Sequence, residues 1–310
     1  MPGQRTRRAT PPNDRVSETA PITLSLPGRQ PERRPEQPVR RFWLCADDYG
    51  ISPAVNRAIR DLIERGRINA TSVMVTAPTF SSGEAAALVA LGGAAIGLHF
   101  TLTAPFQPST PAYRPVARDG AFPSLPKKLA TGLMGRLDPA SLRAEAESQF
   151  EAFRAAFGRP PDFVDGHQHV HLLPQVSDAL LAVMSEQAPA AWVRQCGRPT
   201  RLSRRWGDPK GLLLDVLSRR LRSRSAAHGI ATNPAFAGTY NFARHSRYDT
   251  LFASFLEGLP HGGLVMCHPG FVDTELQRLD TLTAMRENEY SFFAGERFPQ
   301  LLAALGFGLA

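Results

Sequence analysis

Short apolar runs alternate along this chain with segments of helical periodicity, and this alternation restricts the fold more than any other feature. The first run, residues 42–46, ends in Asp47 and Asp48 and is followed by an apolar repeat of three or four residues that begins after Ser52. Similar runs recur at 70–77, 95–102, 163–165, 191–193 and 263–267. Such runs between helices are typical of buried strands in βαβ units. We therefore expect an α/β fold with a mainly parallel sheet.

The intervening segments carry helix signals at their ends. Ser52 and Pro53 predict the start of a helix, and Gly66 predicts its end. Further helices are expected at 85–91, at 138–158, from Pro174 onward and at about 299–305. The stretch 104–137 is rich in Pro and Gly and predicts a long irregular loop over one end of the sheet.

The formal net charge of +8 is not spread evenly along the 310 residues. Residues 1–41 contain nine Arg and four acidic residues, and residues 201–224 contain eight Lys or Arg and two acidic residues, so the remainder is mildly acidic. The Pro- and Arg-rich residues 1–40 predict a disordered leader, because such a segment buries too little apolar surface to fold. We expect a single domain over residues 41–310, with a basic insert at about 201–224. This insert could contact a membrane surface, and a segment near 201–250 could mediate a homodimer.

Targeting and cysteine signals favour a reducing, cytoplasmic location. No apolar run is long enough to span a membrane, and no apolar stretch follows Arg7-Arg8 as a secretory signal requires. The three cysteines form no CxxC pair, so neither a disulfide framework nor a thiolate zinc site is expected. The sequence also lacks G-x-S-x-G, Walker A and H-E-x-x-H motifs, which argues against a serine esterase, a P-loop nucleotide-binding protein and a zincin protease.

Polar residues stand where several predicted strands end. Asp47 and Asp48 follow the first strand, and His99 lies in an otherwise apolar strand. Asp165 and His167 stand at the end of the strand at 163–165, and His268 follows the last strand. Because the carboxyl ends of parallel strands meet at one rim, we expect these side chains to converge. Two adjacent carboxylates in an extended chain point to opposite sides, so one can bind a metal while the other addresses a water. The alternatives are a helix cap for the aspartates and hydrogen-bonded core positions for the histidines.

A second polar group consists of His167, His169 and His171, with Asp165 two residues before it. In an extended chain alternate residues face the same way, so we expect three imidazoles on one side with Asp165 behind them. Imidazole is a common ligand of Zn and similar divalent ions, and Asp165 could orient one ring. The spacing predicts a metal site without selecting the ligand, and a solvated strand edge is the alternative.

Four motifs occur in order from about Phe42 to the C-terminus: Ala46-Asp47-Asp48-Tyr49-Gly50, Gly97-Leu98-His99-Phe100, Asp165-Gly166-His167-Gln168-His169-Val170-His171 and Met266-Cys267-His268-Pro269-Gly270. Together they resemble the YdjC-like family, also called the ChbG/HpnK carbohydrate deacetylases. The resemblance implies a distorted, incomplete (β/α) TIM-like barrel. It also implies removal of an acetyl group from an N-acetylated amino sugar, glycan or glycolipid with the help of one divalent metal ion. Tyr49, where Phe is more usual, and Gln168, within what is often a run of three His, depart from the family pattern.

The resemblance assigns roles to single residues. The expected metal ligands are Asp48, His99 and His167. Asp47 is the expected general base, which takes a proton from the water that attacks the acetyl carbonyl. One carboxylate and two imidazoles suit Mg or Zn, with Mn or Co as further possibilities.

Two histidines, His268 and His169, are candidates for the acid that protonates the leaving amine. The expected supporting or substrate-binding residues are Asp165, His171 and Tyr49. We expect a small-molecule or oligosaccharide substrate and no nucleic-acid partner. The alternatives are a related metallohydrolase acting on another amide, an ester or a phosphate, and a non-enzymatic binder of acidic polymers or membrane surfaces.

Overall fold

A computed structural model of the chain describes residues 39–198, 209–240 and 247–310. These residues belong to one unit, Pro38–Ala310. The predicted leader lies almost wholly outside the described residues, and so does the first part of the predicted basic insert, residues 201–208.

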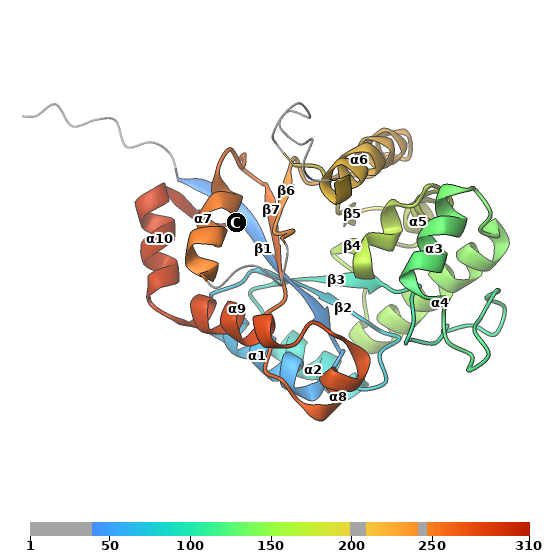
Figure 1. The fold of residues 1–310 in the computed structure, drawn as a ribbon, viewed down its shortest axis with the longest axis horizontal. Coiled ribbons are helices and arrows are strands. Elements are labelled where there is room, and N and C mark those ends of the chain that lie inside the picture. Colours follow the sequence, from blue (N-terminus) through green and yellow to red (C-terminus); the bar gives the residue numbers. More distant parts are fainter. Residues whose placement is uncertain (1–38, 199–208, 241–246) are drawn as a thin grey trace, which may run out of the picture. The chain divides into compact units, whose positions relative to one another are not determined.

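The described residues form a parallel sheet (Figure 1). Its strands are β1 (Arg40–Tyr49), β2 (Ala70–Val73), β3 (Ala95–Phe100), β4 (Phe163–Gly166), β5 (Trp192–Val193), β6 (Phe236–Ala237), β7 (Leu264–Cys267) and β8 (Phe307–Leu309). The spatial order is β5-β4-β3-β2-β1-β7-β6, and β8 pairs with the first part of β1. Every pairing is parallel, so the carboxyl ends of the strands share one rim.

The two edges of the sheet approach each other without completing a ladder. The backbone amide of Val193, at the end of β5, donates a 2.9 Å hydrogen bond to the carbonyl of Ala231, and Val193 forms an isolated parallel bridge with Thr232. The amide of Phe236, in β6, donates a 3.0 Å bond to the carbonyl of Gly197. The predicted α/β fold, an incomplete TIM-like barrel with a mainly parallel sheet, is therefore confirmed.

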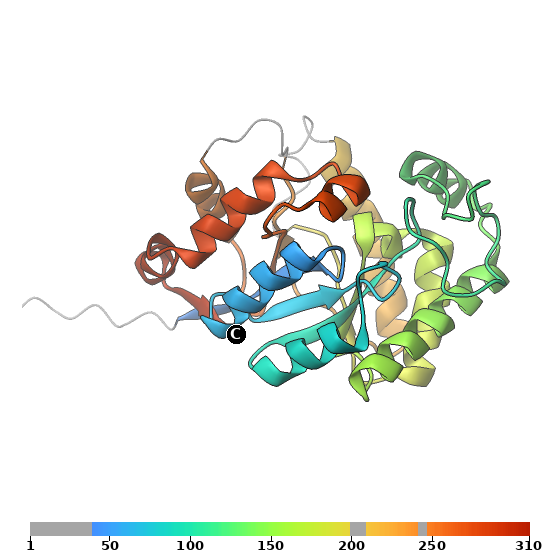
Figure 2. The ribbon, with the colours of Figure 1, turned by 90° about the horizontal axis from the view of Figure 1, so that it is seen from below.

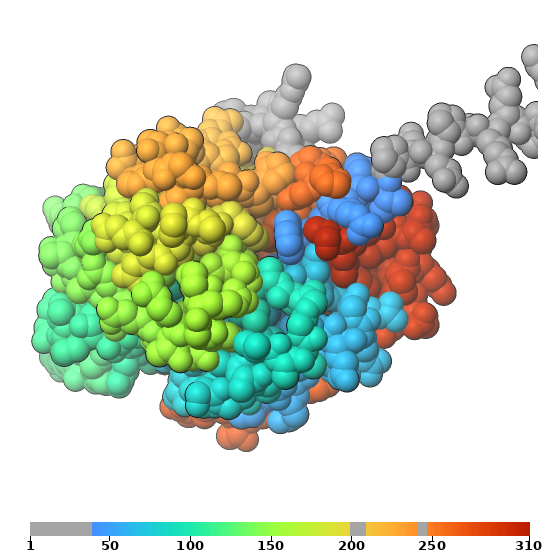
Figure 3. Space-filling model, turned by 180° about the vertical axis from the view of Figure 1, so that it is seen from behind, coloured from blue at the N-terminus to red at the C-terminus, as the bar shows by residue number. Residues whose placement is uncertain are grey.

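Helices surround this sheet (Figure 1). They are α1 (Pro53–Glu64), α2 (Ser82–Leu91), α3 (Leu125–Leu133), α4 (Pro139–Phe157), α5 (Pro174–Gln187), α6 (Pro209–Ala227), α7 (Tyr248–Leu256), α8 (Thr274–Leu279), α9 (Ala284–Ala294) and α10 (Arg297–Leu305). Helices α1, α2 and α4 lie side by side along the sheet (Figure 2). Helices α4, α5 and α6 continue the layer as adjoining green, yellow and orange bands (Figure 3). Helix α1 also packs against α9.

The helix signals in the sequence work as expected at most ends. Ser52 caps α1 by accepting a 3.2 Å hydrogen bond from the amide of Val55, and Gly158 ends α4 in the left-handed conformation. The prediction of an irregular loop over 104–137 was wrong for residues 125–133, which form α3. Pro126 in the first turn starts this helix, and the completely buried Lys128 donates a hydrogen bond to the hydroxyl of Tyr113 in the preceding loop.

Candidate metal centre and active site

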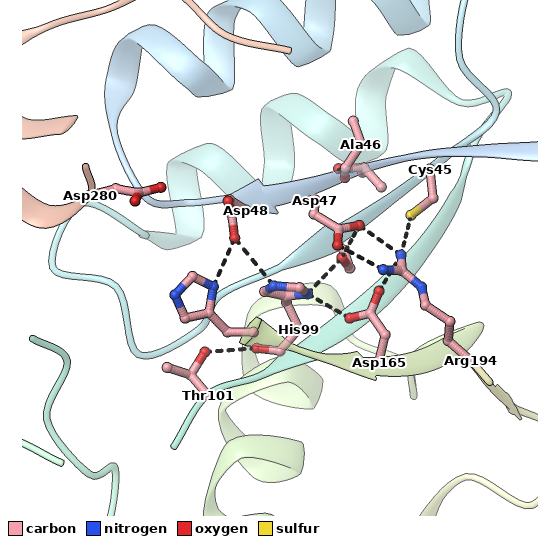
Figure 4. A network of polar contacts seen from close by, with 12 residues as sticks. Cys45, Ala46, Asp47, Asp48, His99, Thr101, Asp165, Arg194 and Asp280 are labelled. Atoms are coloured by element: carbon pink, nitrogen blue, oxygen red, sulfur yellow. Dashed lines mark hydrogen bonds and ion pairs between the residues drawn. The ribbon is translucent and has the colours of Figure 1, made fainter. Parts of the chain in front are cut away.

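The polar residues predicted from the strand ends do converge at the carboxyl rim of the sheet (Figure 4). Asp47 and Asp48 come from the end of β1, and His99 comes from the end of β3. Asp165 lies in β4 directly opposite His99 in the strand register, and His167 follows this strand. The parallel topology thus brings together segments that lie more than 100 residues apart, as between Asp48 and His167.

A bulge in β1 separates the two aspartates. The pairing with β2 runs regularly to Ala46 and resumes at Tyr49, and Asp48 adopts a left-handed backbone conformation with φ of 69°. Asp is among the few residue types that tolerate this conformation. Such bulges redirect side chains next to active sites. Here the bulge turns Asp47 toward Arg194 and Asp48 toward the histidines (Figure 4).

The histidine run is not extended, so the prediction that its three imidazoles share one side was wrong. Residues His167–Leu172 form a 3-10 helix in which Gln168 and His169 have φ of 53° and 61°. His167 points to Asp48, whereas the Nε2 atom of His171 bonds the backbone carbonyl of Arg194 at 2.9 Å. The turn immediately after β4 causes this divergence, because the alternation of side chains holds only in a strand.

Asp48, His99 and His167 form a compact group of donor atoms. Oδ1 of Asp48 lies 3.2 Å from Nε2 of His99 and 3.1 Å from Nδ1 of His167. Ligands about 2.0–2.2 Å from one ion stand about 3.0–3.5 Å from each other, so these separations fit a shared divalent cation. The three side chains are almost fully buried. One carboxylate and two imidazoles are also a donor set that divalent metals accept.

Asp165 and Ser72 hold the other nitrogen of the His99 ring. Oδ1 of Asp165 lies 2.6 Å from Nδ1 of His99, and Oγ of Ser72 lies 3.0 Å from the same nitrogen. Burial alone would lower the pKa of His99, but the charges of Asp165 and Asp47 and the hydrogen bonds to Asp165 and Asp48 raise it to about 10. The surroundings of this ring therefore favour positive charge, as a cation site requires.

Arg194 lies directly after β5 and binds two aspartates, Asp47 and Asp165. Its guanidinium donates two 2.7 Å hydrogen bonds to the carboxylate of Asp47 and lies 2.5 Å from Oδ2 of Asp165. Burial would raise the pKa of Asp47, but the charge and the bonds of Arg194 outweigh it and hold this pKa well below its ordinary value. Cys45, Asp47 and Asp165 also have donor atoms within 4.8 Å of one another. The fully buried guanidinium of Arg194 already supplies positive charge to this second group, in the place that a metal ion would otherwise take.

Arg286, in α9, binds the remaining oxygen of Asp48. Its Nη2 atom lies 2.6 Å from Oδ2 of Asp48 and 2.7 Å from Oδ2 of Asp280, and the arginine is completely buried. Burial would raise the pKa of Asp48, but Arg286 and the bonds from His167 and His99 hold it well below the usual range. The Asp48 carboxylate thus stays ionised, with one oxygen toward the histidines and one toward Arg286.

The two acid candidates both line the cavity but have different surroundings. Burial lowers the pKa of His268, whereas Asp48 and Asp47 act in the opposite direction. Burial also lowers the pKa of His169, and there the neighbouring His171, Arg194 and Lys210 lower it further. Of the two, His268 is therefore the easier to protonate.

Tyr49 lies behind the doublet and away from the cavity lining. Its hydroxyl donates to Glu84 of α2 at 2.9 Å and accepts a 2.8 Å hydrogen bond from Arg60 of α1. These contacts tie the end of β1 to two outer helices. The Tyr49 hydroxyl thus serves helix packing.

Sequence reasoning missed Arg194, Arg286 and Glu289. Arg194 could have been found, because it is the charged residue that directly follows the apolar run at 191–193. Arg286 and Glu289 stand in the polar segment Ala284–Ala294, where charged residues are ordinary. Glu289 accepts a 2.5 Å bond from the backbone amide of His268 and a 2.5 Å bond from the Tyr240 hydroxyl. Nothing in the local pattern distinguishes these buried positions from exposed ones.

A cavity of about 330 Å³ opens beside these residues, within the usual range for small-ligand pockets. Its polar end is formed by the aspartate doublet and four histidines, namely His99, His167, His169 and His268. Its remaining wall includes leucines of α3 and α6 together with polar residues, namely Gln168, Lys210, Thr239, Asp280 and Thr281. A buried carboxylate–imidazole group at the end of such a cavity is suited to hydrolytic chemistry on a bound ligand.

The sequence model described as YdjC-like protein matches residues 41–304. The chain belongs to the YdjC-like family. The match extends over all four motifs and over the arginines that the structure adds to the site.

Relatives of this YdjC-like chain include proteins named chitooligosaccharide deacetylase from Yersinia pestis (strain Pestoides F) and Yersinia pseudotuberculosis serotype O:3 (strain YPIII). Each is 31% identical over 248 residues, which cover 74% of this chain and 82% of the relative. A solved structure from Enterococcus faecalis V583, of a protein for which cellobiose-phosphate cleavage has been suggested, matches with a TM-score of 0.70 and 20% identity over 88% of this chain and 97% of that chain. At this identity the structural match supports the fold alone.

Two further observations concern surfaces of this YdjC-like chain. Among the described residues, no helix combines the length and the hydrophobicity that a membrane span requires. Helix α6 carries part of the predicted basic insert, and its Arg220 and Arg224 pair with Asp178 of α5 at 2.8 and 2.9 Å. These two arginines therefore help to fix α6 on the barrel.

Proposed function

We propose that this chain is a metal-dependent hydrolase that removes the acetyl group from an N-acetylated amino sugar, as a free sugar or within a glycan or glycolipid. The observation that carries this proposal is the buried group of Asp48, His99 and His167 beside Asp47 at the end of a ligand-sized cavity. Relatives named chitooligosaccharide deacetylase, at 31% identity, support the reaction class.

We infer that Asp48, His99 and His167 hold one divalent ion. When bound, the ion supplies a Lewis acid that polarises the acetyl carbonyl and lowers the pKa of a water molecule. Two imidazole donors favour Zn over Mg, which prefers oxygen ligands, and Mn or Co would also suit the set. Asp165 orients His99 from behind, as carboxylates commonly do for metal-binding histidines.

Asp47 takes the proton of the attacking water in this proposal. Arg194 keeps Asp47 ionised at neutral pH and fixes its carboxylate with two hydrogen bonds. Such fixing holds a base in the orientation that proton transfer needs. His171 supports Arg194 in turn, because its ring nitrogen Nε2 bonds the backbone carbonyl of Arg194.

The amine that leaves the acetyl carbon needs a proton, and we assign its donor to His268. The carboxylates of Asp47 and Asp48 favour the protonated form of this ring, whereas Arg194 and Lys210 oppose protonation of His169. The products would be acetate and a free amino sugar. The buried free thiols of Cys45, Cys196 and Cys267 support the proposal that the enzyme works in the reducing cytoplasm.

Metal analysis combined with acetate release tests this function. The metal-loaded chain should release acetate from N-acetylglucosamine or its oligomers. Asp47→Asn should keep the metal and lose at least about a hundredfold in kcat, because the base is removed while the ligands remain. Asp48→Asn should lower the metal content, since a ligand loses its charge.

A parallel panel of acetyl esters and phosphodiesters separates this proposal from the related hydrolases. Turnover of an ester or a phosphodiester without any turnover of acetamido sugars would replace the deacetylase by another metallohydrolase. Unchanged acetate release by Asp47→Asn would remove this residue from the role of the base.

A further inference from the structure

The turn that follows β7 carries His268, the proposed donor of the proton to the leaving amine. His268 lines the cavity, whereas Pro269 and Gly270 after it are buried. The ladder between β7 and β1 ends at Cys267, and the ladder between β7 and β6 ends earlier. The backbone amide of His268 therefore needs an acceptor from outside the sheet, since an amide shielded from water is costly to leave unpaired.

Glu289 of α9 supplies this acceptor. Its Oε2 atom accepts a 2.5 Å hydrogen bond from the amide of His268, and its Oε1 atom accepts a 2.5 Å bond from the hydroxyl of Tyr240. The glutamate is completely buried. Because both oxygens are bonded, the carboxyl group has a fixed position, and the amide that it holds is fixed as well.

The main chain of α9 holds the other end of the same turn. The amide of Gly270 donates a 3.1 Å hydrogen bond to the carbonyl of Arg286, which stands about one helical turn before Glu289. Pro269 lies between the two contacts, and a proline restricts the residue before it to extended conformations. The turn at 268–270 is therefore bound to α9 at both ends and has little freedom between them.

Gly270 shows how closely this turn approaches the helices. A Cβ atom at this position would lie 2.9 Å from Cγ2 of Val55 in α1 and 3.4 Å from Cδ of Arg286 in α9. The first separation is well inside the optimal carbon–carbon distance of about 3.5–4.0 Å. A larger residue would have to displace Val55 or the turn itself.

We propose that Glu289 is a positioning residue for His268, because it holds the turn at 268–270 on α9 and so keeps the imidazole beside the metal group. The side chain of Arg286, on the same buried face of α9, binds Asp48. One helix face thus fixes both the proposed acid and one proposed metal ligand. This inference rests on the proposed deacetylase function and adds a residue that lies behind the cavity lining.

The expected effect of Glu289 follows from the geometry of proton transfer. The donor must stay within hydrogen-bond distance of the leaving nitrogen, and a displacement of about 1 Å can cost about a hundredfold in rate. Without the carboxyl group, the turn keeps only its bond at Gly270. The loss should appear in kcat rather than in KM, because the acid acts in the transition state.

Glu289→Met tests the inference, because it keeps the length of the side chain and removes both acceptor atoms. We expect kcat for acetate release from N-acetylglucosamine oligomers to fall by about 10–100-fold, with KM and metal content unchanged. Glu289→Gln, whose side-chain carbonyl can still accept from the His268 amide, should restore most of this kcat. Glu287→Met, on the exposed side of α9, is the matched control and should keep the wild-type kcat.

A double-mutant cycle with His268→Ala shows whether Glu289 acts through His268. In the His268→Ala background, Glu289→Met should change kcat by no more than about twofold, because the group that it positions is absent. A general weakening of the fold would instead lower kcat by the same factor in both backgrounds. That result would overturn the inference.

Tyr240→Phe gives a second route to the same answer if the melting temperature shows that Glu289→Met does not fold. This variant leaves the bond to the His268 amide and removes only the hydroxyl that holds Oε1 of Glu289. We expect a loss of about two- to tenfold in kcat, as for one hydrogen bond, and no such loss in the His268→Ala background. A wild-type kcat in Tyr240→Phe would then overturn the inference.

The outcomes separate this inference from the proposed function. No acetate from any acetamido sugar with the wild type would overturn both. A wild-type kcat in a folded Glu289→Met would overturn the positioning role and leave the deacetylase in place. A Glu289→Gln variant as slow as Glu289→Met would also overturn it, because the acceptor for the His268 amide would then not be what matters.

Discussion

Arg286 donates a 2.6 Å hydrogen bond to Oδ2 of Asp48, the carboxylate oxygen that faces away from His99 and His167. The other oxygen, Oδ1, lies within 3.2 Å of both histidines. Helix α9 thus determines how Asp48 presents its charge, although α9 contributes none of the proposed ligands. This arrangement leaves Oδ1 as the oxygen available to an ion.

Replacing Arg286 should weaken metal binding. In Arg286→Met, Asp48 loses the partner that orients it, and losing such a partner commonly costs about 10–100-fold in metal affinity. Isothermal titration of the metal-free chain with Zn²⁺ measures the change. Arg278→Met is a suitable control, because Arg278 is exposed and pairs only with Glu275 among the ion pairs of the described residues. Equal affinities for the two variants would contradict a positioning role for Arg286.

Removing the charge of Asp165 should affect both the metal and the base. Asp165→Asn weakens the hold on His99 and leaves Arg194 with Asp47 as its remaining carboxylate partner at the site. We expect a metal affinity lower by about tenfold or more. Ser72→Ala, which removes only the weaker contact to the same ring nitrogen, should have a smaller effect. A larger loss of metal affinity in Ser72→Ala than in Asp165→Asn would show that Ser72 contributes more than Asp165 to holding His99.

The two acid candidates should separate in kcat. His268→Ala should lower kcat by about 10²–10⁴-fold with little change in KM, because an acid acts in the transition state. His169→Ala should have a smaller effect on kcat. Steady-state kinetics on an N-acetylglucosamine glycoside, with metal content measured in parallel, decides between them. A larger loss of kcat in His169→Ala would transfer the acid role to that residue.

The stability of the fold should depend on the protonation of Glu289. Burial raises the pKa of Glu289 to about 7, against the opposing bonds from Tyr240 and the amide of His268. The folded chain therefore binds this proton more tightly than the unfolded chain, whose Glu pKa is about 4.3. The stabilisation is complete below a pH of about 4.3 and is lost as the pH rises through about 7, a change of up to about 4 kcal/mol.

Urea unfolding of the wild type and Glu289→Gln between pH 5 and 8 measures this dependence. The wild type should lose stability relative to the variant as the pH rises, because only the wild type must release the buried proton. The difference between the two curves removes the contributions of the other titrating groups. Parallel curves would show that Glu289 ionises as readily in the fold as in the unfolded chain.

The alternation of strands and helices was sufficient to predict an α/β fold with a mainly parallel sheet, because buried parallel strands leave a clear apolar pattern. The incomplete barrel was predicted from the family resemblance. The meeting of Asp48, His99 and His167 followed from the shared rim of the strands. The shape of the histidine run did not follow, because periodicity can be read only while the chain stays in a strand, and β4 ends at Gly166. Arg286 and Glu289 were not predictable, because a buried charged residue in a polar helix looks the same in sequence as an exposed one.

The bulge in β1 has a consequence for related sequences. Two neighbouring aspartates serve two different partners only because the strand contains one more residue there than regular pairing with β2 requires. A relative with a one-residue gap at this point would keep its hydrophobic interior and fold normally. It would nevertheless have a single aspartate to serve as both metal ligand and general base. Such a gap would therefore mark a relative that has lost hydrolysis and kept the fold.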